Sequence, residues 1–175
     1  YAEEAAKKIF KGQSDITLEP IGTIYDCITT VFKDKVDACV VPIENSLEGS
    51  VSQTLDILVE YADELKIVNE LDLNISHCLL AKEKIKLNTI KDVYSHPQAI
   101  SQCSKFLRNN LTDISTHLVQ STAKGAKMVQ ENERKHVTAI ASKTAAKEFG
   151  LEIIAENIAD ASHNVTRFVV ISKAT

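Results

Sequence analysis

The amino-acid sequence predicts an α/β fold with a largely parallel sheet. Short apolar runs typical of β-strands alternate with helix-like runs throughout the chain. The chain has 175 residues, of which 44% are hydrophobic, so it can bury a core as one domain or as two small lobes.

Two extended segments, near residues 67–80 and 150–162, indicate a two-lobed organisation. We expect the chain to leave a first lobe through one segment and to return through the other. Residues 1–77 with 159–175 would form the first lobe, and residues 78–158 the second. The cleft between the lobes is then the expected ligand site. The same periodicity also allows a single doubly wound sheet.

The first lobe is expected to begin with two helices and a strand. Residues 2–10 are alanine-rich with acidic residues in their first turn, and residues 22–35 repeat apolar positions at helical spacing. Residues 37–43 form a buried strand that we expect to stop at Pro42, because proline has no backbone N–H to donate to a neighbouring strand.

The clearest amphipathic helix is predicted over residues 50–65. Ser50 is a suitable N-cap for it. Its expected apolar face consists of Val51, Leu55, Leu58 and Val59. Residues 66–81 then alternate between apolar and polar side chains. The length of this segment suits a strand that crosses between lobes better than it suits a hairpin.

The second lobe repeats a pattern of strand followed by helix. Strands are expected over residues 92–96, 116–120 and 137–142, and helices over residues 97–110, 121–132 and 143–150. Pro97 suits a first helical turn, Ser121 and Ser142 suit N-caps, and Gly150 suits the end of a helix. Residues 167–172 form the last expected strand.

Composition excludes several classes of function. The net charge is −4 with dispersed Lys and Arg, which argues against nucleic-acid binding, and no apolar run approaches the roughly 20 residues of a membrane span. We expect no secretory signal. The cysteines lie far apart without a C-x-x-C pair, which predicts reduced thiols in a cytoplasmic protein: Cys27, Cys39, Cys78 and Cys103. The histidines show no metal-binding spacing, and we expect neither a metal nor a cofactor.

Four polar clusters follow predicted strands and precede predicted helices. They are "PIENSLEGS" after Val41, "SHPQ" after Tyr94, "QSTA" after Val119 and "ASKT" after Ile140. The carboxyl ends of parallel strands would direct the helix N-termini toward one crevice, where their free N–H groups favour anions. Ordinary capping explains "ASKT", but Glu44, Asn45 and Ser46 exceed what one cap requires. The residues alone thus predict a site for a carboxylate-bearing compound, without deciding between an enzyme and a binding protein.

In their order and spacing these stretches resemble the catalytic domain of the prephenate dehydratase family. The likeness runs from Tyr1 to about Lys173. The matching stretches are "VVPIENSLEGSV" with "LDIL", "YSHPQAISQC", "STAKGA", "AAKEFGL" and "NVTRFVVI". The resemblance implies a fold similar to type II periplasmic-binding proteins, with two α/β lobes and a cleft.

The resemblance also implies a reaction. Prephenate would lose its ring carboxylate as carbon dioxide and its ring hydroxyl as water, giving phenylpyruvate for phenylalanine synthesis without a cofactor or metal. In this family the Thr of "TRF", here Thr166, is expected to stabilise charge on the leaving oxygen, with a proton relayed from Glu44 or water.

The remaining roles implied by the resemblance concern binding. Asn45, Ser46 and Gln102 would position the substrate, and Ser121 with Thr122 would bind a carboxylate. Phe168 would pack beside the site and hold Thr166 in place. Arg167 would be either structural or paired with a carboxylate of the substrate. Relatives are commonly homodimers or larger assemblies, so a homo-oligomer is expected.

Three departures from the family pattern qualify these expectations. A strand and a glycine-containing loop expected before the first helix are missing from the sequence, which starts at Tyr1 and has Met128 as its one methionine. Gln120 stands where the family often has an acidic residue. The 175 residues include neither an ACT regulatory domain nor a chorismate mutase domain, so we assign no feedback control to them. Arogenate dehydratase, on the same scaffold, and a non-catalytic carboxylate-binding module of the periplasmic-receptor type are the alternatives.

Overall fold

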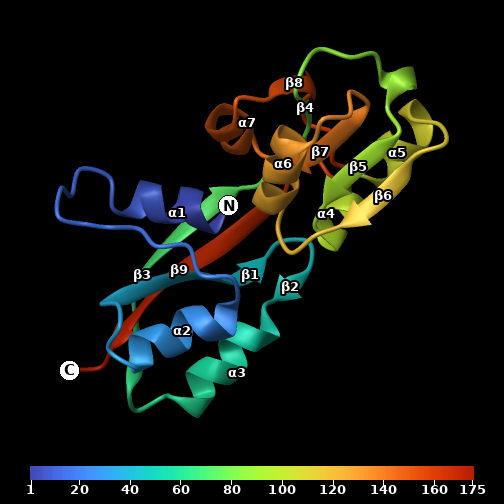
Figure 1. Cartoon of the computed structure of the whole chain (residues 1–175). Coiled ribbons are helices and arrows are strands. Elements are labelled where there is room, and N and C mark those ends of the chain that lie inside the picture. The colour runs from blue at the N-terminus through green and yellow to red at the C-terminus, as the bar shows by residue number, and fades with distance from the viewer. The chain divides into compact units, whose positions relative to one another are not determined.

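The computed structural model describes residues 1–175, which separate into two compact units (Figure 1). The first unit contains residues 1–74 and 163–175, and the second contains residues 75–162. These boundaries differ from the expected ones by three residues at one crossing (74 against 77) and by four at the other (163 against 159). The α/β class is confirmed, with one sheet in each unit.

The first unit has a four-stranded sheet in the order β2-β1-β9-β3. Its elements are α1 (Ala2–Ile9), α2 (Ile24–Phe32), β1 (Ala38–Asn45), β2 (Gly49–Ser50), α3 (Ser52–Glu60), β3 (Leu65–Asn74) and β9 (Val165–Lys173). All of its strand pairings are antiparallel, so the prediction of a largely parallel sheet is wrong for this unit. The sequence pattern misses this because β9 arrives from the far end of the chain and lies between β1 and β3.

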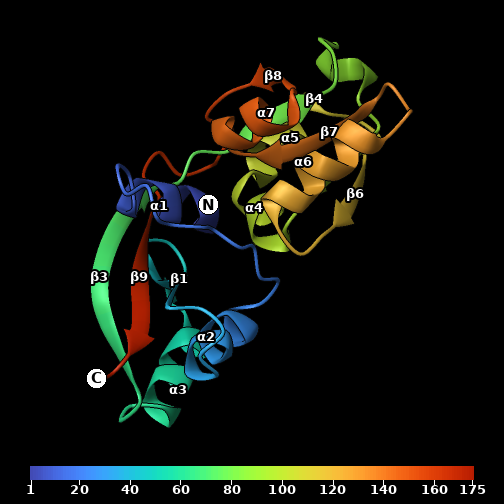
Figure 2. The same ribbon diagram turned by 60° about the vertical axis from the view of Figure 1, so that its left-hand side comes forward.

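The core of the first unit lies between this sheet and the helices α2 and α3, which run along one of its faces (Figure 2). Alternate residues of β1 and β9 point into that core, including Cys39, Val41, Val169 and Ile171. Thr166 lies an odd number of positions before Val169, so alternation points it to the opposite face. Asn45 reaches that face too, because the register shift between Pro42 and Glu44 reverses the alternation that Cys39 and Val41 begin. Strand register, with this bulge, therefore decides which polar side chains can meet.

Two details of the first unit correct the sequence prediction. β1 does not stop at Pro42 but continues to Asn45, and its register with β9 shifts between Pro42 and Glu44. A bulge accommodates a residue without an N–H, because the ladder is already interrupted there.

The apolar face predicted for α3 is only partly right, because Leu58 packs against the core whereas Leu55 and Val59 are exposed. Its buried residues are Thr54 and Ile57, whereas Val59 is 78% exposed, and Ser50 lies in β2 rather than capping the helix. Thr54 donates its hydroxyl to the carbonyl of Pro42 at 2.7 Å, which fixes the rotation of α3 against β1.

The second unit has a five-stranded sheet in the order β6-β5-β7-β4-β8. Its elements are β4 (Cys78–Ala81), a 3₁₀ turn (Leu87–Thr89), β5 (Asp92–Ser95), α4 (Pro97–Gln102), α5 (Ser104–Asn110), β6 (Ser115–Leu118), α6 (Thr122–Glu131), β7 (Val137–Ala141), α7 (Lys143–Phe149) and β8 (Glu152–Ala155). β5 pairs in parallel with β6 and β7, whereas β4 pairs antiparallel with β7 and β8. The sheet is therefore mixed rather than largely parallel.

Helices cover both faces of this second sheet. On one face Ala126, Val129, Ala145 and Ala146 from α6 and α7 pack against the sheet, and on the other Ala99 and Leu107 from α4 and α5 do so. Burial on both faces explains why β7 is apolar except for Thr138.

The helix starts of the second unit follow the sequence prediction closely. Ser121 and Ser142 cap α6 and α7, Pro97 opens α4, and Gly150 ends α7 in the left-handed conformation at φ 63°. The single helix predicted over residues 97–110 is wrong, because it is divided into α4 and α5. The carboxylate of Asp160 accepts hydrogen bonds from the hydroxyl of Ser104 and the N–H of Lys105, and so starts a new helix there.

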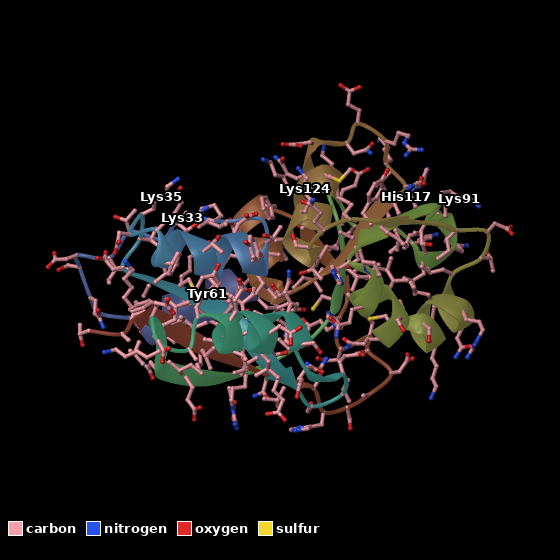
Figure 3. All side chains as sticks on the ribbon, turned by 90° about the horizontal axis from the view of Figure 1, so that it is seen from below. Lys33, Lys35, Tyr61, Lys91, His117 and Lys124 are labelled. Atoms are coloured by element: carbon pink, nitrogen blue, oxygen red, sulfur yellow. The ribbon has the colours of Figure 1, made fainter.

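No helix in the structure combines the length and apolar character that a membrane span requires. All four cysteines are free thiols, and Cys39, Cys78 and Cys103 are buried. Burial raises the pKa of Cys103 to about 12. Positive side chains are spread over separate elements, with Lys33 and Lys35 after α2, Lys91 before β5, and Lys124 in α6 (Figure 3).

Candidate functional site

Asn45 and Thr166 meet on the face of the first sheet that α2 and α3 leave uncovered. They lie directly opposite each other in the β1–β9 pairing, and the side-chain amide of Asn45 donates to Thr166 Oγ1 at 2.8 Å. Each side chain is only 9% exposed. The sequence separates these two residues by 121 positions, and strand register alone brings them together.

The side chain of Asn45 has no hydrogen-bonding capacity left for a ligand. Its Oδ1 accepts the backbone N–H groups of Leu47 at 2.9 Å and Glu48 at 3.1 Å. Its Nδ2 donates one hydrogen to Asn164 Oδ1 at 2.8 Å and the other to Thr166 Oγ1. A primary amide has two hydrogens to donate and two lone pairs to accept, and here all four are used within the first unit.

The hydroxyl of Thr166 is different, because it accepts a hydrogen bond from Asn45 and donates none to any group of the chain. A threonine hydroxyl has one hydrogen to give. Since Asn45 can only donate at this contact, that hydrogen points away from Asn45. The arrangement leaves a fixed hydrogen-bond donor for an acceptor atom of a ligand.

Ser46 and Phe168 support Thr166 from either side. Ser46 donates its N–H to the carbonyl of Val165, and its hydroxyl accepts the N–H of Val165, both at 2.9 Å. Phe168 is 3% exposed and lies two residues beyond Thr166, on the same face of β9. The two hydrogen bonds of Ser46 hold the start of β9 against the loop after β1.

The structure does not bring Glu44 and Arg167 to Thr166. These two residues pair with each other in register, so both belong to the opposite face of the sheet. There they line an open pocket of about 310 Å³ whose other lining residues are Ile43, Ser50, Leu55, Ile67, Glu70 and Val169. Strand alternation separates them from the Thr166 hydroxyl by the thickness of the sheet.

Arg167 is held by an ion pair within the sheet. Its Nε lies 2.9 Å from Asp72 Oδ1 on β3, and its Nη2 lies 3.5 Å from Asp72 Oδ2. The hydrogen bond from Arg167 lowers the pKa of the Asp72 carboxyl, and the positive charge lowers it further. Both side chains are well exposed, so the pair belongs to the surface of the unit.

In the second unit Gln102 is oriented by a buried histidine. His77 Nε2 lies 2.8 Å from Gln102 Oε1, and His77 is only 2% exposed. Burial lowers the pKa of His77, and the hydrogen bond with Gln102 opposes part of that change. The neutral ring that burial favours can donate to Gln102 Oε1, which leaves the amide nitrogen of Gln102 as the end that faces away from His77.

Ser121 and Thr122 stand at the start of α6. The hydroxyl of Ser121 accepts the backbone N–H of Lys124 at 3.0 Å, as an N-cap does. Thr122 is the first helical residue and is half-buried. The two hydroxyls therefore lie at the positive end of a helix dipole, where anions are stabilised.

Gly125 allows α6 to approach the sheet closely. A Cβ at this position would lie 2.9 Å from the carbonyl oxygen of Tyr94 and 3.2 Å from its carbonyl carbon. The glycine of "STAKGA" thus has a packing role, bringing the start of α6 against the end of β5.

A match to the prephenate dehydratase family model covers residues 1–175. The chain belongs to the prephenate dehydratase family. Prephenate dehydratase from Methanocaldococcus jannaschii is 42% identical over 174 residues, covering 99% of this chain and 61% of that protein. Arogenate dehydratase 2 from Petunia hybrida is 38% identical over 175 residues, covering 99% of this chain and 42% of that one. The chain thus spans about two fifths to three fifths of these relatives.

A crystal structure of prephenate dehydratase from Arthrobacter aurescens in complex with L-Phe has the same fold. It is 31% identical with a TM-score of 0.87, and the match covers 99% of this chain and 57% of that one. Both units of the present chain therefore have their counterpart in a prephenate dehydratase.

Sequence reasoning missed two residues that hold predicted site residues in place. Asn164 contacts Asn45, and it stands two positions before Thr166, a spacing that puts both on one side of an extended chain. His77 contacts Gln102, but it lies 25 positions away in an unrelated segment, and no sequence pattern joins the two.

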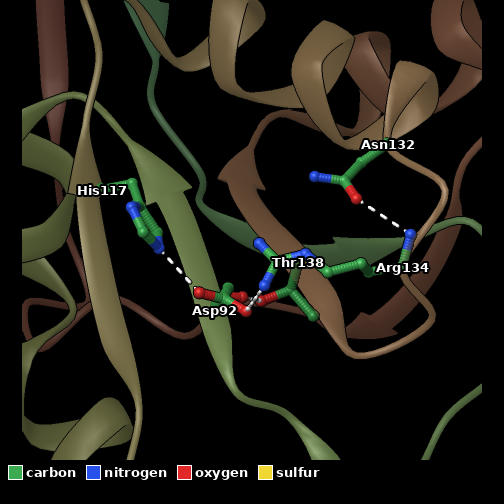
Figure 4. Close-up of polar contacts among 5 residues, drawn as sticks. All are labelled: Asp92, His117, Asn132, Arg134 and Thr138. Carbon is green, nitrogen blue, oxygen red and sulfur yellow. Dashed lines mark hydrogen bonds and ion pairs between the residues drawn. The ribbon is translucent and has the colours of Figure 1, made fainter.

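A further polar cluster, around Asp92, was also missed (Figure 4). The Asp92 carboxylate lies 2.7 Å from His117 Nε2 and 3.3 Å from Arg134 Nη1, and its backbone carbonyl accepts the hydroxyl of Thr138 at 2.9 Å. Asn132 accepts the backbone N–H of Arg134 at 2.9 Å. These contacts join the starts of β5 and β7 to β6, which is a structural role within the second unit.

Proposed function

We propose that this chain carries the catalytic activity of a prephenate dehydratase, converting prephenate to phenylpyruvate, carbon dioxide and water. One observation above all supports this: Thr166 presents a hydroxyl that Asn45 leaves free to donate. Membership of the prephenate dehydratase family supports the choice of substrate.

The proposed reaction needs little beyond a placed hydrogen bond. As the bond between the ring and its carboxylate breaks, that electron pair forms a ring double bond and carbon dioxide leaves. The electron pair of the ring C–O bond leaves with the hydroxyl oxygen, which takes one proton from solvent to become water. Formation of the aromatic ring drives both steps, and Thr166 stabilises the charge that develops on the departing oxygen.

A hydrogen bond is the contribution that suits a threonine. Its hydroxyl is too weak an acid to supply the proton itself, but a fixed donor aimed at a developing negative charge accelerates such steps by about 10²–10³-fold. Glu44 lies on the other face of the sheet, so the proposal assigns it no relay to Thr166.

Roles in substrate binding are proposed within each unit separately. Thr166 contacts the departing hydroxyl, while Ser121 and Thr122 bind a carboxylate at the α6 N-terminus. Gln102 contributes an amide that His77 orients. Asn45 and Ser46 act through Thr166 and the start of β9, and Phe168 packs beneath them.

Arogenate dehydratase activity is the second candidate, because relatives of this chain include an arogenate dehydratase at 38% identity. Arogenate carries an amino group where prephenate carries a keto group, and the leaving hydroxyl is the same. A non-catalytic carboxylate-binding module is the third candidate, because the Thr166 hydroxyl can also donate to a carboxylate oxygen; turnover distinguishes it from an enzyme. We also propose a cytoplasmic homo-oligomer, on the basis of the dispersed free thiols and the family resemblance.

The test is to incubate the wild-type chain and Thr166→Ala with prephenate and, separately, with arogenate. Phenylpyruvate formed from prephenate, or phenylalanine formed from arogenate, identifies the substrate. The proposal predicts wild-type activity on prephenate and a large loss of turnover in Thr166→Ala. Binding of either compound without turnover by the wild-type chain would favour the binding module instead.

A further inference from the structure

We propose that Asn164 is a positioning residue of the dehydratase reaction, acting through Asn45 on Thr166. This inference rests on the function proposed above. Asn164 lies one residue before β9, is 5% exposed, and accepts a hydrogen bond from Asn45 Nδ2 at 2.8 Å.

The role follows from the two hydrogens of the Asn45 amide. One goes to Asn164 Oδ1 and the other to Thr166 Oγ1, each over 2.8 Å. Because Asn164 takes the first hydrogen, the second has one direction left, toward Thr166. Hydrogen bonds at Oδ1 and at both hydrogens of Nδ2 then fix the plane of the Asn45 amide.

These hydrogen bonds all run in the same direction. Backbone N–H groups of Leu47 and Glu48 donate to Asn45 Oδ1, and Asn45 Nδ2 donates onward to Asn164 and Thr166. In such a chain each hydrogen bond polarises the next. Accepting a hydrogen bond from Asn45 therefore makes the Thr166 hydroxyl a stronger hydrogen-bond donor. Removing the acceptor of Asn164 leaves one buried N–H of Asn45 without its partner and lets the amide tip away from Thr166.

The position of Asn164 is itself well determined. The next residue, Val165, exchanges two hydrogen bonds with Ser46, and Thr166 continues β9 opposite Asn45. The backbone on the C-terminal side of Asn164 therefore cannot shift without breaking the contact between β9 and the loop after β1. A change at the Asn164 side chain acts on the Asn45 amide rather than on the path of the strand.

The experiment compares Asn164→Ala with Asn164→Asp. Aspartate keeps an acceptor for Asn45, lacks the amide donor of asparagine and adds a negative charge, so a retained kcat would show that the acceptor is the property that matters. We expect Asn164→Ala to lower kcat for prephenate by roughly 10–100-fold with KM little changed, the penalty of a slightly misplaced catalytic group. Asn164→Asp should retain most of the wild-type kcat. Asn110→Ala, at an exposed asparagine of α5, is the control and should behave as wild type.

A double-mutant cycle distinguishes positioning from a general structural role. In the Thr166→Val background there is no hydroxyl to position, so Asn164→Ala should cost little further kcat. Thermal unfolding of each variant shows that it is folded at the assay temperature.

Each outcome decides the inference. Full loss in Asn164→Asp, additive effects in the cycle, or a change in KM alone would overturn the role of Asn164 while leaving the dehydratase proposal intact. Wild-type activity in Asn164→Ala would do the same. An inactive wild-type chain would instead overturn the dehydratase proposal, and this inference with it.

Discussion

The two units hold their candidate site residues by different physical means. In the first unit, Thr166 and Asn45 sit on neighbouring strands, and directional hydrogen bonds fix both side chains. In the second, Ser121 and Thr122 sit at a helix N-terminus, where the favourable field for an anion comes from many backbone groups at once. In the function proposed above, the first unit therefore contributes one accurately placed hydrogen, whereas the second contributes a helix N-terminus that favours an anion.

The largest effect expected from this comparison is that of Asn45→Asp. Aspartate still accepts the N–H groups of Leu47 and Glu48 but has no hydrogen for Thr166, so the Thr166 hydroxyl turns inward and donates to the new carboxylate. We expect kcat for prephenate to fall by about 10²–10³-fold with a smaller change in KM. Steady-state kinetics of the purified variant provides the measurement, and a wild-type kcat would show that Asn45 does not orient Thr166.

Next in size is the effect of Gly125→Ala on the stability of the second unit. The added Cβ would lie 2.9 Å from the Tyr94 carbonyl oxygen, a backbone atom that cannot rotate away. We expect a loss of about 1–3 kcal/mol in the free energy of unfolding, which outweighs the usual gain of alanine over glycine in a helix. Gly22→Ala is the matched control, because no heavy atom lies within 4 Å of its added Cβ. Equal urea midpoints for the two variants would contradict the close approach of α6 to β5.

A smaller effect is expected from pH acting on His77. Its folded pKa is lowered by burial, so below the ordinary value of about 6.5 the unfolded chain binds a proton more readily than the folded one. The free energy of unfolding therefore falls as the pH drops from 6.5 toward the folded pKa, and it is regained as the pH rises. His77→Gln should flatten this part of the stability profile, measured by urea unfolding at a series of pH values. An unchanged slope would assign the acid sensitivity to another group.

The smallest effect is expected from Arg167→Gln. Arg167 pairs with Asp72 on an exposed strand and faces away from Thr166, so its loss should leave kcat and KM for prephenate close to wild type. Kinetics with both prephenate and arogenate is the measurement. A large rise in KM would mean that Arg167 binds a substrate carboxylate. The face of the sheet opposite Thr166 would then also contact the substrate, against the expectation here.

Local features of the fold were predictable from the sequence, but strand pairing was not. The caps at Ser121 and Ser142 and the turn at Gly150 depend on neighbouring residues, and each was predicted correctly. The antiparallel sheet of the first unit depends on β9, which returns from the end of the chain to lie between β1 and β3. Short-range periodicity contains no information about such a partner.

In the candidate site, too, single residues were predictable from the sequence but the contacts between them were not. The motif "TRF" drew attention to Thr166, and "ENS" to Asn45, but only register shows that the two touch. Glu44 and Arg167 were grouped with them because they are adjacent in sequence. Adjacent residues of a strand point to opposite faces. The sheet therefore separates the pair Glu44 and Arg167 from the pair Asn45 and Thr166.

The measurement that tests the central claim most directly compares Thr166→Val with Thr166→Ser on prephenate. Valine has nearly the shape of threonine but no hydroxyl, whereas serine keeps the hydroxyl and loses the methyl group. If Thr166 supplies a hydrogen bond to the departing oxygen, Thr166→Val loses about 10²–10³-fold in kcat and Thr166→Ser retains most of it, with KM similar in both. Wild-type turnover in Thr166→Val, or equal losses in the two variants, would contradict that role.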